Sequence, residues 1–375
     1  MRIAQLAPLY EDVPPTAYGG TERVIADLCD GLTAAGHDVT LFATGSSRTQ
    51  ARLEPVVSAP LRDRMTAAEM VDVGPHLHLR MLADVFERAA DFDVIHSHTD
   101  LWTLPFTRSV STPTVLTLHG RLDLPSTQRL LPMYPEISLV SISDHQRRAL
   151  DGLGVSWAAT VPNGLDLEDY HRQHRQAGTH LAFVGRICSE KRPDLAVEIA
   201  HRTGRRLQVA AKVDPTDEEY FAESIKPLFD RYDVEYVGEL GERHKPGFYA
   251  AASATLFPSD WPEPFGLVMI ESLAAGTPVI ALRRGAVPEV IEHGVSGFIC
   301  DDVDEMVAAV GLLDEIDPAA CRQRARDFGA DQMCARYESV YTDILEGLPG
   351  EVRTSPVEPV SDVRLRDSMA SMLSP

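Results

Sequence analysis

Two basic side chains in the second half of the chain have the type and spacing needed to bind a diphosphate. Arg186 and Lys191 lie five residues apart, between a short apolar run and Pro193, which is well placed to open a helix. Two cations in such a strand-to-helix loop could clamp both phosphates, the arginine by its planar fork and the lysine as a point charge. They could equally form a solvated basic loop beside Glu190 and Asp194. Spacing alone leaves both interpretations open.

Two glutamates lie at the start of a later predicted helix. Glu263 comes just before it, and Glu271 lies about one and a half turns inside it, next to Ile270. Their carboxylates could accept hydrogen bonds from sugar hydroxyls, although Glu263 could instead only interact with the helix dipole. Burial of Glu271 without a partner would be costly, which favours a functional role. The helix also begins with free amides that could bind phosphate, those of Phe265, Gly266 and Leu267.

Further candidates follow predicted strands of the first half. Tyr18, Gly19 and Gly20 precede a helix, where two glycines permit close approach of the backbone to a phosphate or simply form a turn. His119 ends one strand, and the segment from His96 through His98 to Asp100 ends another. Ser143 follows a third strand and has the chemistry of a helix N-cap.

The elements that must position these residues alternate between strand and helix in two runs, which predicts an α/β protein with two parallel, doubly wound sheets. We expect ligands in the cleft between them, at the carboxyl ends of the strands. The predicted domains are residues 1–168 and 169–330. A helix over 331–346 follows, and we expect the tail, residues 347–375, to be mobile. The predicted strands are Arg2–Leu6, Asp38–Phe42, Val94–His96, Thr114–Leu118, Leu139–Ile142, Leu181–Val184, Leu207–Ala210, Glu235–Val237, Ala254–Phe257, Val279–Ala281 and Gly297–Cys300. The predicted helices are Glu22–Ala35, His78–Ala90 and Asp331–Leu345.

The segment EPFGLVMIESLAAGTPVIA, which starts at Glu263, resembles the retaining glycosyltransferases of family four. The spacing of Glu263 and Glu271 is that family's E-x7-E motif, and the similarity extends to about residue 345. Four further segments carry it: Gly185-Arg186 with Lys191, Pro162-Asn163-Gly164, Val287–Ile291 and Gly297–Ile299.

This resemblance implies a GT-B fold, in which two Rossmann-like domains face a central cleft and the second binds most of a nucleotide-sugar donor. Arg186 and Lys191 would then hold the diphosphate, Glu263 the transferring sugar and Glu271 the ribose. It also implies that the last helix crosses back onto the first domain.

The resemblance gives roles to the other candidates as well. Phe265, Gly266 and Leu267 would bind sugar and phosphate through their amides, and Gly19 and Gly20 would face the diphosphate. His119 would lie near the donor sugar and act in catalysis together with Glu263, Arg186 and Lys191. We also expect Val237 in the nucleobase pocket and an acceptor side at Tyr18, His98, Asp100 and Ser143.

No metal site or cofactor is expected. The two histidines before Asp100 lack a third ligand at readable spacing, and two DxD segments, Asp91–Asp93 and Asp302–Asp304, lie away from the expected cleft or at a helix start. The five cysteines form no CxxC pair, so we expect reduced thiols and a cytoplasmic protein.

The formal charge of −21 argues against binding to nucleic acid, and no segment predicts a membrane span or membrane docking. The chain has four lysines, so an anionic ligand must be met by a few placed cations and by backbone amides. Nothing in the sequence indicates an oligomeric state.

The prediction is therefore a retaining, metal-independent hexosyltransferase that uses a UDP-glucose-like donor and an acceptor hydroxyl, with a small soluble acceptor preferred. The main alternative is a GT-B sugar-nucleotide epimerase. A non-catalytic nucleotide-sugar-binding module is a second one. A dinucleotide-dependent oxidoreductase is a third, but it would need a GxGxxG loop that the chain lacks.

Overall fold

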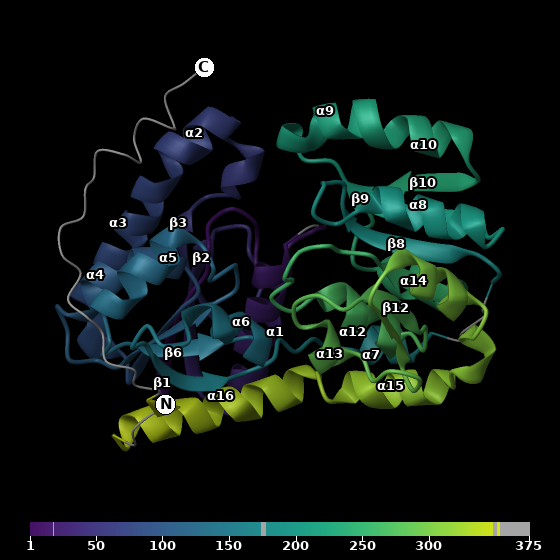
Figure 1. Ribbon diagram of the computed structural model, residues 1–375. Coiled ribbons are helices and arrows are strands. Elements are labelled where there is room, and N and C mark those ends of the chain that lie inside the picture. The colour runs from purple at the N-terminus through teal and green to yellow at the C-terminus, as the bar shows by residue number, and fades with distance from the viewer. Residues whose placement is uncertain (18, 174–177, 348–350, 353–375) are drawn as a thin grey trace.

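The computed structural model describes residues 1–17, 19–173, 178–347 and 351–352, which form two α/β lobes side by side (Figure 1). The sheet of the first lobe has the order β14-β7-β6-β5-β4-β1-β2-β3. Its strands are β1 (Arg2–Leu6), β2 (Asp38–Thr44), β3 (Arg52–Val57), β4 (Val94–Ser97), β5 (Thr114–Leu118), β6 (Ser138–Ser141), β7 (Ser156–Thr160) and β14 (Glu351–Val352). All neighbours pair in parallel except β14, which is antiparallel to β7.

The second lobe is built on a parallel sheet with the order β10-β9-β8-β11-β12-β13. Its strands are β8 (Leu181–Arg186), β9 (Leu207–Lys212), β10 (Val234–Gly238), β11 (Ala254–Phe257), β12 (Val279–Leu282) and β13 (Gly297–Cys300). The predicted fold class, two doubly wound parallel sheets, is thus confirmed.

The eleven predicted strands are all present, with ends shifted by two residues at most. Three strands were not predicted: β3, β7 and β14. β3 and β7 are largely half-buried, so their sequences lack the continuous apolar run that marks a strand covered on both faces. β14 lies within the tail that was expected to be mobile, and there Glu351 and Val352 pair with β7.

Helices cover both sheets. In the first lobe they are α1 (Gly20–Ala34), α2 (Ala67–Asp72), α3 (Gly74–Glu87), α4 (Leu104–Thr107), α5 (Pro125–Leu130) and α6 (Asp144–Arg147). After them come α7 (Glu168–His171), α8 (Pro193–Arg202), α9 (Glu218–Tyr220), α10 (Lys226–Arg231), α11 (Lys245–Ala251), α12 (Leu267–Ala274), α13 (Val287–Val290), α14 (Val303–Val310), α15 (Pro318–Arg326) and α16 (Ala330–Leu345). Among the described residues, no helix combines the length and the apolar character required to span a bilayer.

The last helix, α16, runs beneath the first lobe after α15 has covered the second (Figure 1). It packs on α1, where Gly31 leaves room for the Cys334 thiol: a Cβ at Gly31 would lie 2.4 Å from Sγ. The two segments that cross between the lobes touch each other. The Leu165 amide donates to the Phe328 carbonyl at 3.1 Å, and the Ala330 amide donates to the Leu165 carbonyl at 2.9 Å. The lobes are therefore joined by a hydrogen-bonded pair of chain segments.

Candidate active site

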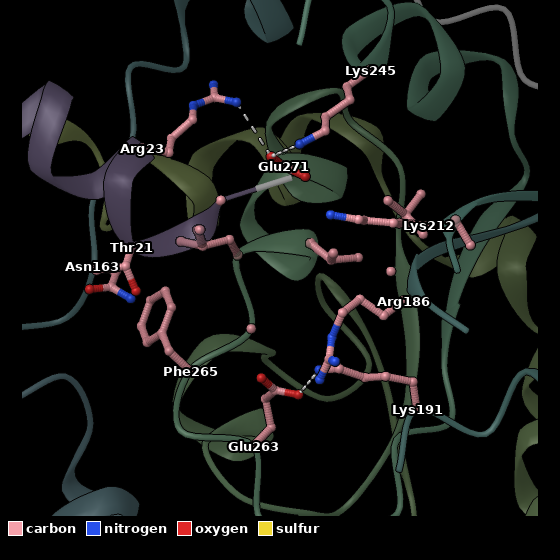
Figure 2. A pocket seen from close by; sticks show the side chains of 18 of the residues that line it. Thr21, Arg23, Asn163, Arg186, Lys191, Lys212, Lys245, Glu263, Phe265 and Glu271 are labelled. Carbon is pink, nitrogen blue, oxygen red and sulfur yellow. Dashed lines mark hydrogen bonds and ion pairs between the residues drawn. The ribbon is translucent and has the colours of Figure 1, made fainter. Parts of the chain in front are cut away.

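A cavity of about 330 Å³ opens between the two lobes, at the carboxyl ends of β5, β8 and β9. Of the predicted site residues, it brings together Gly19, Gly20, His119, Arg186, Lys191, Glu263, Phe265, Gly266, Leu267 and Glu271. It also has lining residues that sequence reasoning missed, among them Arg23, Asn163, Lys212, Glu242 and Lys245. Figure 2 shows several of these side chains converging on one space.

One wall of the cavity carries three cations that converge from β8, β9 and the loop after β8. Nη1 of Arg186 lies 3.4 Å from Oδ2 of Asp214, and Nζ of Lys212 lies 3.4 Å from Oδ1 of the same carboxylate. Lys191 forms an ion pair with Glu263 and lies over the Trp261 ring, 5.3 Å from its centroid. A diphosphate would meet positive charge here in a chain that is otherwise strongly acidic.

Two helix N-termini point into the same space. Neither α1 nor α12 has a side-chain cap, because glycine occupies both N-cap positions, Gly19 at φ +153° and Gly266 at φ +94°. The helices approach each other across the cleft, since a Cβ at Gly20 would lie 3.2 Å from Cδ1 of Leu267. Uncapped N-terminal amides and the helix dipoles favour a bound anion at this point.

Glu263 is held by its backbone and by its side chain. Gly285, at φ +57°, packs so tightly on Glu263 that an added Cβ would lie 2.2 Å from the Glu263 carbonyl oxygen. The Ala286 amide donates to that oxygen at 2.9 Å, and the Trp261 indole donates to the carboxylate at 2.9 Å. The Glu263 carboxylate is thus fixed beside Lys191 at the cavity wall.

Glu271 is buried and surrounded by donors from both lobes. The Tyr249 hydroxyl donates to Oε2 at 2.7 Å, while Oε1 lies 3.4 Å from Nζ of Lys245 and 3.7 Å from Nη1 of Arg23. Burial raises the pKa of the Glu271 carboxyl, but the charges of Lys245 and Arg23 outweigh it and hold the pKa below its ordinary value. Figure 2 shows Arg23 and Lys245 both directed at Glu271. Glu271 is therefore a carboxylate ready to accept further hydrogen bonds.

His119 lines the cavity, and its Nε2 lies 2.9 Å from Nδ1 of the buried His98. Desolvation lowers the pKa of the His119 imidazole to about 4, so it is neutral at physiological pH. His98 lies behind His119 rather than among the residues that line the cavity.

Three other expected contacts do not line the cavity. Val237 is 38 % exposed at the far edge of the sheet; the register of β10 shifts between Tyr236 and Gly238, and the cavity wall there is formed by Glu239 and Leu240. Ser143 caps α6 and donates to the Pro264 carbonyl at 2.7 Å, a contact between the lobes. Asp100 is exposed at φ +51°. Tyr18 lies outside the described residues.

Within the described part of the chain, no group of three or more His, Cys, Asp or Glu side chains could hold a metal ion. The two DxD segments have other roles there. Asp93 accepts hydrogen bonds from the backbone and guanidinium of Arg2, and Asp302 caps α14 through the Glu305 amide.

The arrangement can bind a diphosphate at the cations and helix N-termini and place a sugar beside Glu263 and His119. Together with the two facing α/β lobes, this arrangement is that of a glycosyltransferase with the GT-B fold. Residues 18–169 match the family described as Glycosyltransferase Family 4, and residues 169–328 match the one described as Glycosyl transferases group 1. The chain belongs to the GT-B glycosyltransferases of family four.

Similar proteins of known name agree with this class. A phosphatidyl-myo-inositol mannosyltransferase of Mycolicibacterium smegmatis is 29% identical over 84% of this chain and 85% of its own. A glycogen synthase of Mycobacterium tuberculosis is 26% identical over 98% and 100%. Neither is an epimerase, so that alternative gains no support from these similarities.

Solved structures share the fold. AviGT4, a glycosyltransferase involved in avilamycin A biosynthesis, superimposes with a TM-score of 0.69 at 25% identity, covering 93% of this chain and 99% of its own. HepE of Anabaena in complex with UDP has a TM-score of 0.71 at 17% identity, over 92% of this chain and all of its own.

Proposed function

We propose that this glycosyltransferase moves a hexosyl group from a nucleotide sugar to an acceptor hydroxyl, with retention of configuration and without a metal ion. The observation that carries the proposal is the convergence of Arg186, Lys191 and Lys212 with two uncapped helix N-termini at one cavity that also contains Glu263. These cations supply the charge that a metal ion would otherwise give a leaving diphosphate.

Donor binding would exchange the ion-pair partners of the three cations. The ion pair of Lys191 with Glu263 breaks, and Lys191 binds the diphosphate instead. Arg186 and Lys212 likewise exchange their ion pairs with Asp214 for contacts with the diphosphate. The freed carboxylate of Glu263 then accepts hydrogen bonds from hydroxyls of the sugar, and Glu271 accepts them from the ribose. Because the ion pairs are already present, the cations are ordered before the donor arrives.

In the transfer step the bond between the anomeric carbon and the phosphate oxygen breaks, and the diphosphate leaves with the electron pair. The acceptor oxygen attacks from the same face and forms the new glycosidic bond, and its proton passes to the departing phosphate. The α12 amides and the three cations stabilise the negative charge that develops on the diphosphate.

A UDP-glucose-like donor is the first choice. Support comes from HepE, which shares the fold and has been solved with UDP and with UDP-glucose. For the acceptor, the names of similar proteins include an inositol phosphate: a D-inositol 3-phosphate glycosyltransferase of Kribbella flavida is 25% identical over 89% of this chain. Small polyols and their phosphates are therefore the first acceptors to test.

The test begins with thermal unfolding in the presence of UDP-, GDP- and ADP-sugars. The donor that raises the midpoint most is then incubated with a polyol and saccharide panel, with and without EDTA, and the anomeric configuration of the product is read by NMR. We expect nucleotide release that depends on the acceptor, resists EDTA and yields a retained anomer. An inverted product, loss of activity with EDTA, or sugar isomerisation without an acceptor would each overturn the proposal.

A further inference from the structure

A continuous chain of buried hydrogen bonds leads from the cavity to the last helix. It starts at His119, passes through His98 and Gln5, and ends at Tyr341 of α16. Gln5 and Tyr341 have no exposed surface, and His98 is 2 % exposed. Donors and acceptors inside such a network are mutually dependent, because each buried group needs its partner.

The direction of each hydrogen bond follows from the amide of Gln5. Its Nε2 donates to the Tyr341 hydroxyl at 3.1 Å, so its Oε1, an acceptor only, faces Nε2 of His98 at 3.0 Å. Nε2 of His98 must therefore carry the proton. Since burial lowers the pKa of His98 well below its ordinary value, the ring is neutral and its Nδ1 is an acceptor.

The same logic determines the tautomer of His119. Its Nε2 lies 2.9 Å from Nδ1 of His98, which is an acceptor, so Nε2 of His119 is the protonated nitrogen. The remaining nitrogen, Nδ1, has no hydrogen-bond partner among the described residues and carries a lone pair. The Gln146 amide donates to the carbonyls of Leu118 and Gly120, both at 2.8 Å, and so fixes the backbone on either side of the ring.

We propose that Gln5, His98 and Tyr341 are positioning residues that hold His119 as the Nε2–H tautomer. The cavity is thereby offered Nδ1 as a hydrogen-bond acceptor. An acceptor nitrogen favours a ligand group that donates a hydrogen bond, such as a sugar hydroxyl. It cannot donate a hydrogen bond to a phosphate oxygen. The inference rests on the proposed function for the ligand, but the tautomer itself does not.

Docking of α16 is part of this arrangement. The Tyr341 hydroxyl accepts from Gln5 and is 2.7 Å from Nδ1 of His96, so loss of Tyr341 frees the Gln5 amide to turn. Tyr337, one turn earlier on α16, provides a matched control. It is equally buried, but its hydroxyl contacts Thr117 at 2.9 Å, and no hydrogen bond joins it to Gln5 among the described residues.

The test is histidine tautomer spectroscopy on the full chain labelled with 15N-histidine, without any ligand, with His119→Gln used to assign the resonances. We expect a single Nε2–H form of His119 at neutral pH. An Nδ1–H form, a charged ring or an equal mixture in the wild type would overturn the inference, and none of these results depends on the identity of the donor.

Variants then test the positioning residues. Gln5→Met and Tyr341→Phe should give both tautomers of His119, whereas Tyr337→Phe should keep one; thermal unfolding confirms that each variant is folded. Calorimetry with UDP and UDP-glucose should show about a twofold loss of affinity for UDP-glucose alone in Gln5→Met, because only the rings that remain in the Nε2–H form offer the acceptor nitrogen. An unchanged tautomer in Gln5→Met and Tyr341→Phe would contradict the positioning role. A wild type that binds neither nucleotide would contradict the proposed donor instead.

Discussion

Arg23 and Glu271 face each other across the cleft, with Nη1 of the arginine 3.7 Å from Oε1 of the glutamate. Arg23 belongs to α1 of the first lobe and Glu271 to α12 of the second. Arg23 also pairs with Glu242, and Lys245 contacts both acids. An ionic cluster of four side chains therefore links the lobes directly beside the expected ribose position.

Arg23→Gln should lower kcat/KM by about tenfold or more and weaken donor binding, because Glu271 loses a neutralising charge and the lobes lose a contact. Glu271→Gln should also be impaired. The double variant should be less destabilised than the sum of the single ones, since the two side chains interact directly. Steady-state kinetics and thermal unfolding measure both effects. Arg52→Gln, at a side chain 70 % exposed, is the control, and equal losses in both arginine variants would contradict the role of Arg23.

Lys191→Met should lower kcat/KM by about 100-fold or more, because the leaving diphosphate loses a charge that the site has already oriented. Glu263→Ala should also lose most of the transferase activity, because hydroxyls of the donor sugar lose their hydrogen-bond acceptor. Lys226→Met is the matched control, since Lys226 is 56 % exposed and paired with Asp230 on α10. Near-normal turnover and donor affinity in Lys191→Met would contradict the assignment of Lys191 to diphosphate binding.

Residues at the end of a strand or at the start of a helix could be predicted from the sequence. Arg186, Glu263 and Gly266 are examples, because local signals place each at a strand end or helix start, and parallel strands put those ends at one edge. Val237 was expected in the nucleobase pocket, but the register of β10 shifts beside it, and Glu239 rather than Val237 lines the cavity. The pattern of apolar and polar residues in the sequence does not predict such a register shift.

The residues that were missed depend on which elements meet in space. Arg23 reaches Glu271 only because α1 and α12 face each other, and Lys245 comes from the start of a separate helix. One signal was available: of the four lysines, Lys191, Lys212 and Lys245 line the cavity, so the rarity of lysine in an acidic chain was itself informative.

Glu22 in the first turn of α1 should make the protein less stable as the pH rises. Burial raises the pKa of its carboxyl to about 7, above its ordinary value of 4.5. Folding therefore favours the protonated form; the stabilisation is complete below about pH 4.5 and is lost as pH rises through about 7. Glu22→Gln should raise the unfolding midpoint at pH 8 relative to wild type and leave it nearly unchanged at pH 5. Glu87→Gln, at an exposed side chain of α3, is the control. An equal gain for Glu22→Gln at both pH values would contradict the assignment.

Gly164 lies where the two crossing segments touch, and it should tolerate no side chain. A Cβ there would lie 2.6 Å from the Gly329 carbonyl oxygen and 2.7 Å from Cβ of Met333. Neither atom is the end of a flexible side chain, so Gly164→Ala must push the segment around Gly164 away from Gly329 and the start of α16. We expect this to lower the free energy of unfolding by about 1–3 kcal/mol. Gly247→Ala on α11 is the control, because nothing lies within 4 Å of its added Cβ and alanine favours the helix. Denaturant unfolding should show Gly164→Ala destabilised and Gly247→Ala equal to or above wild type; the reverse order would mean that the contact between the crossings does not limit the stability of the chain.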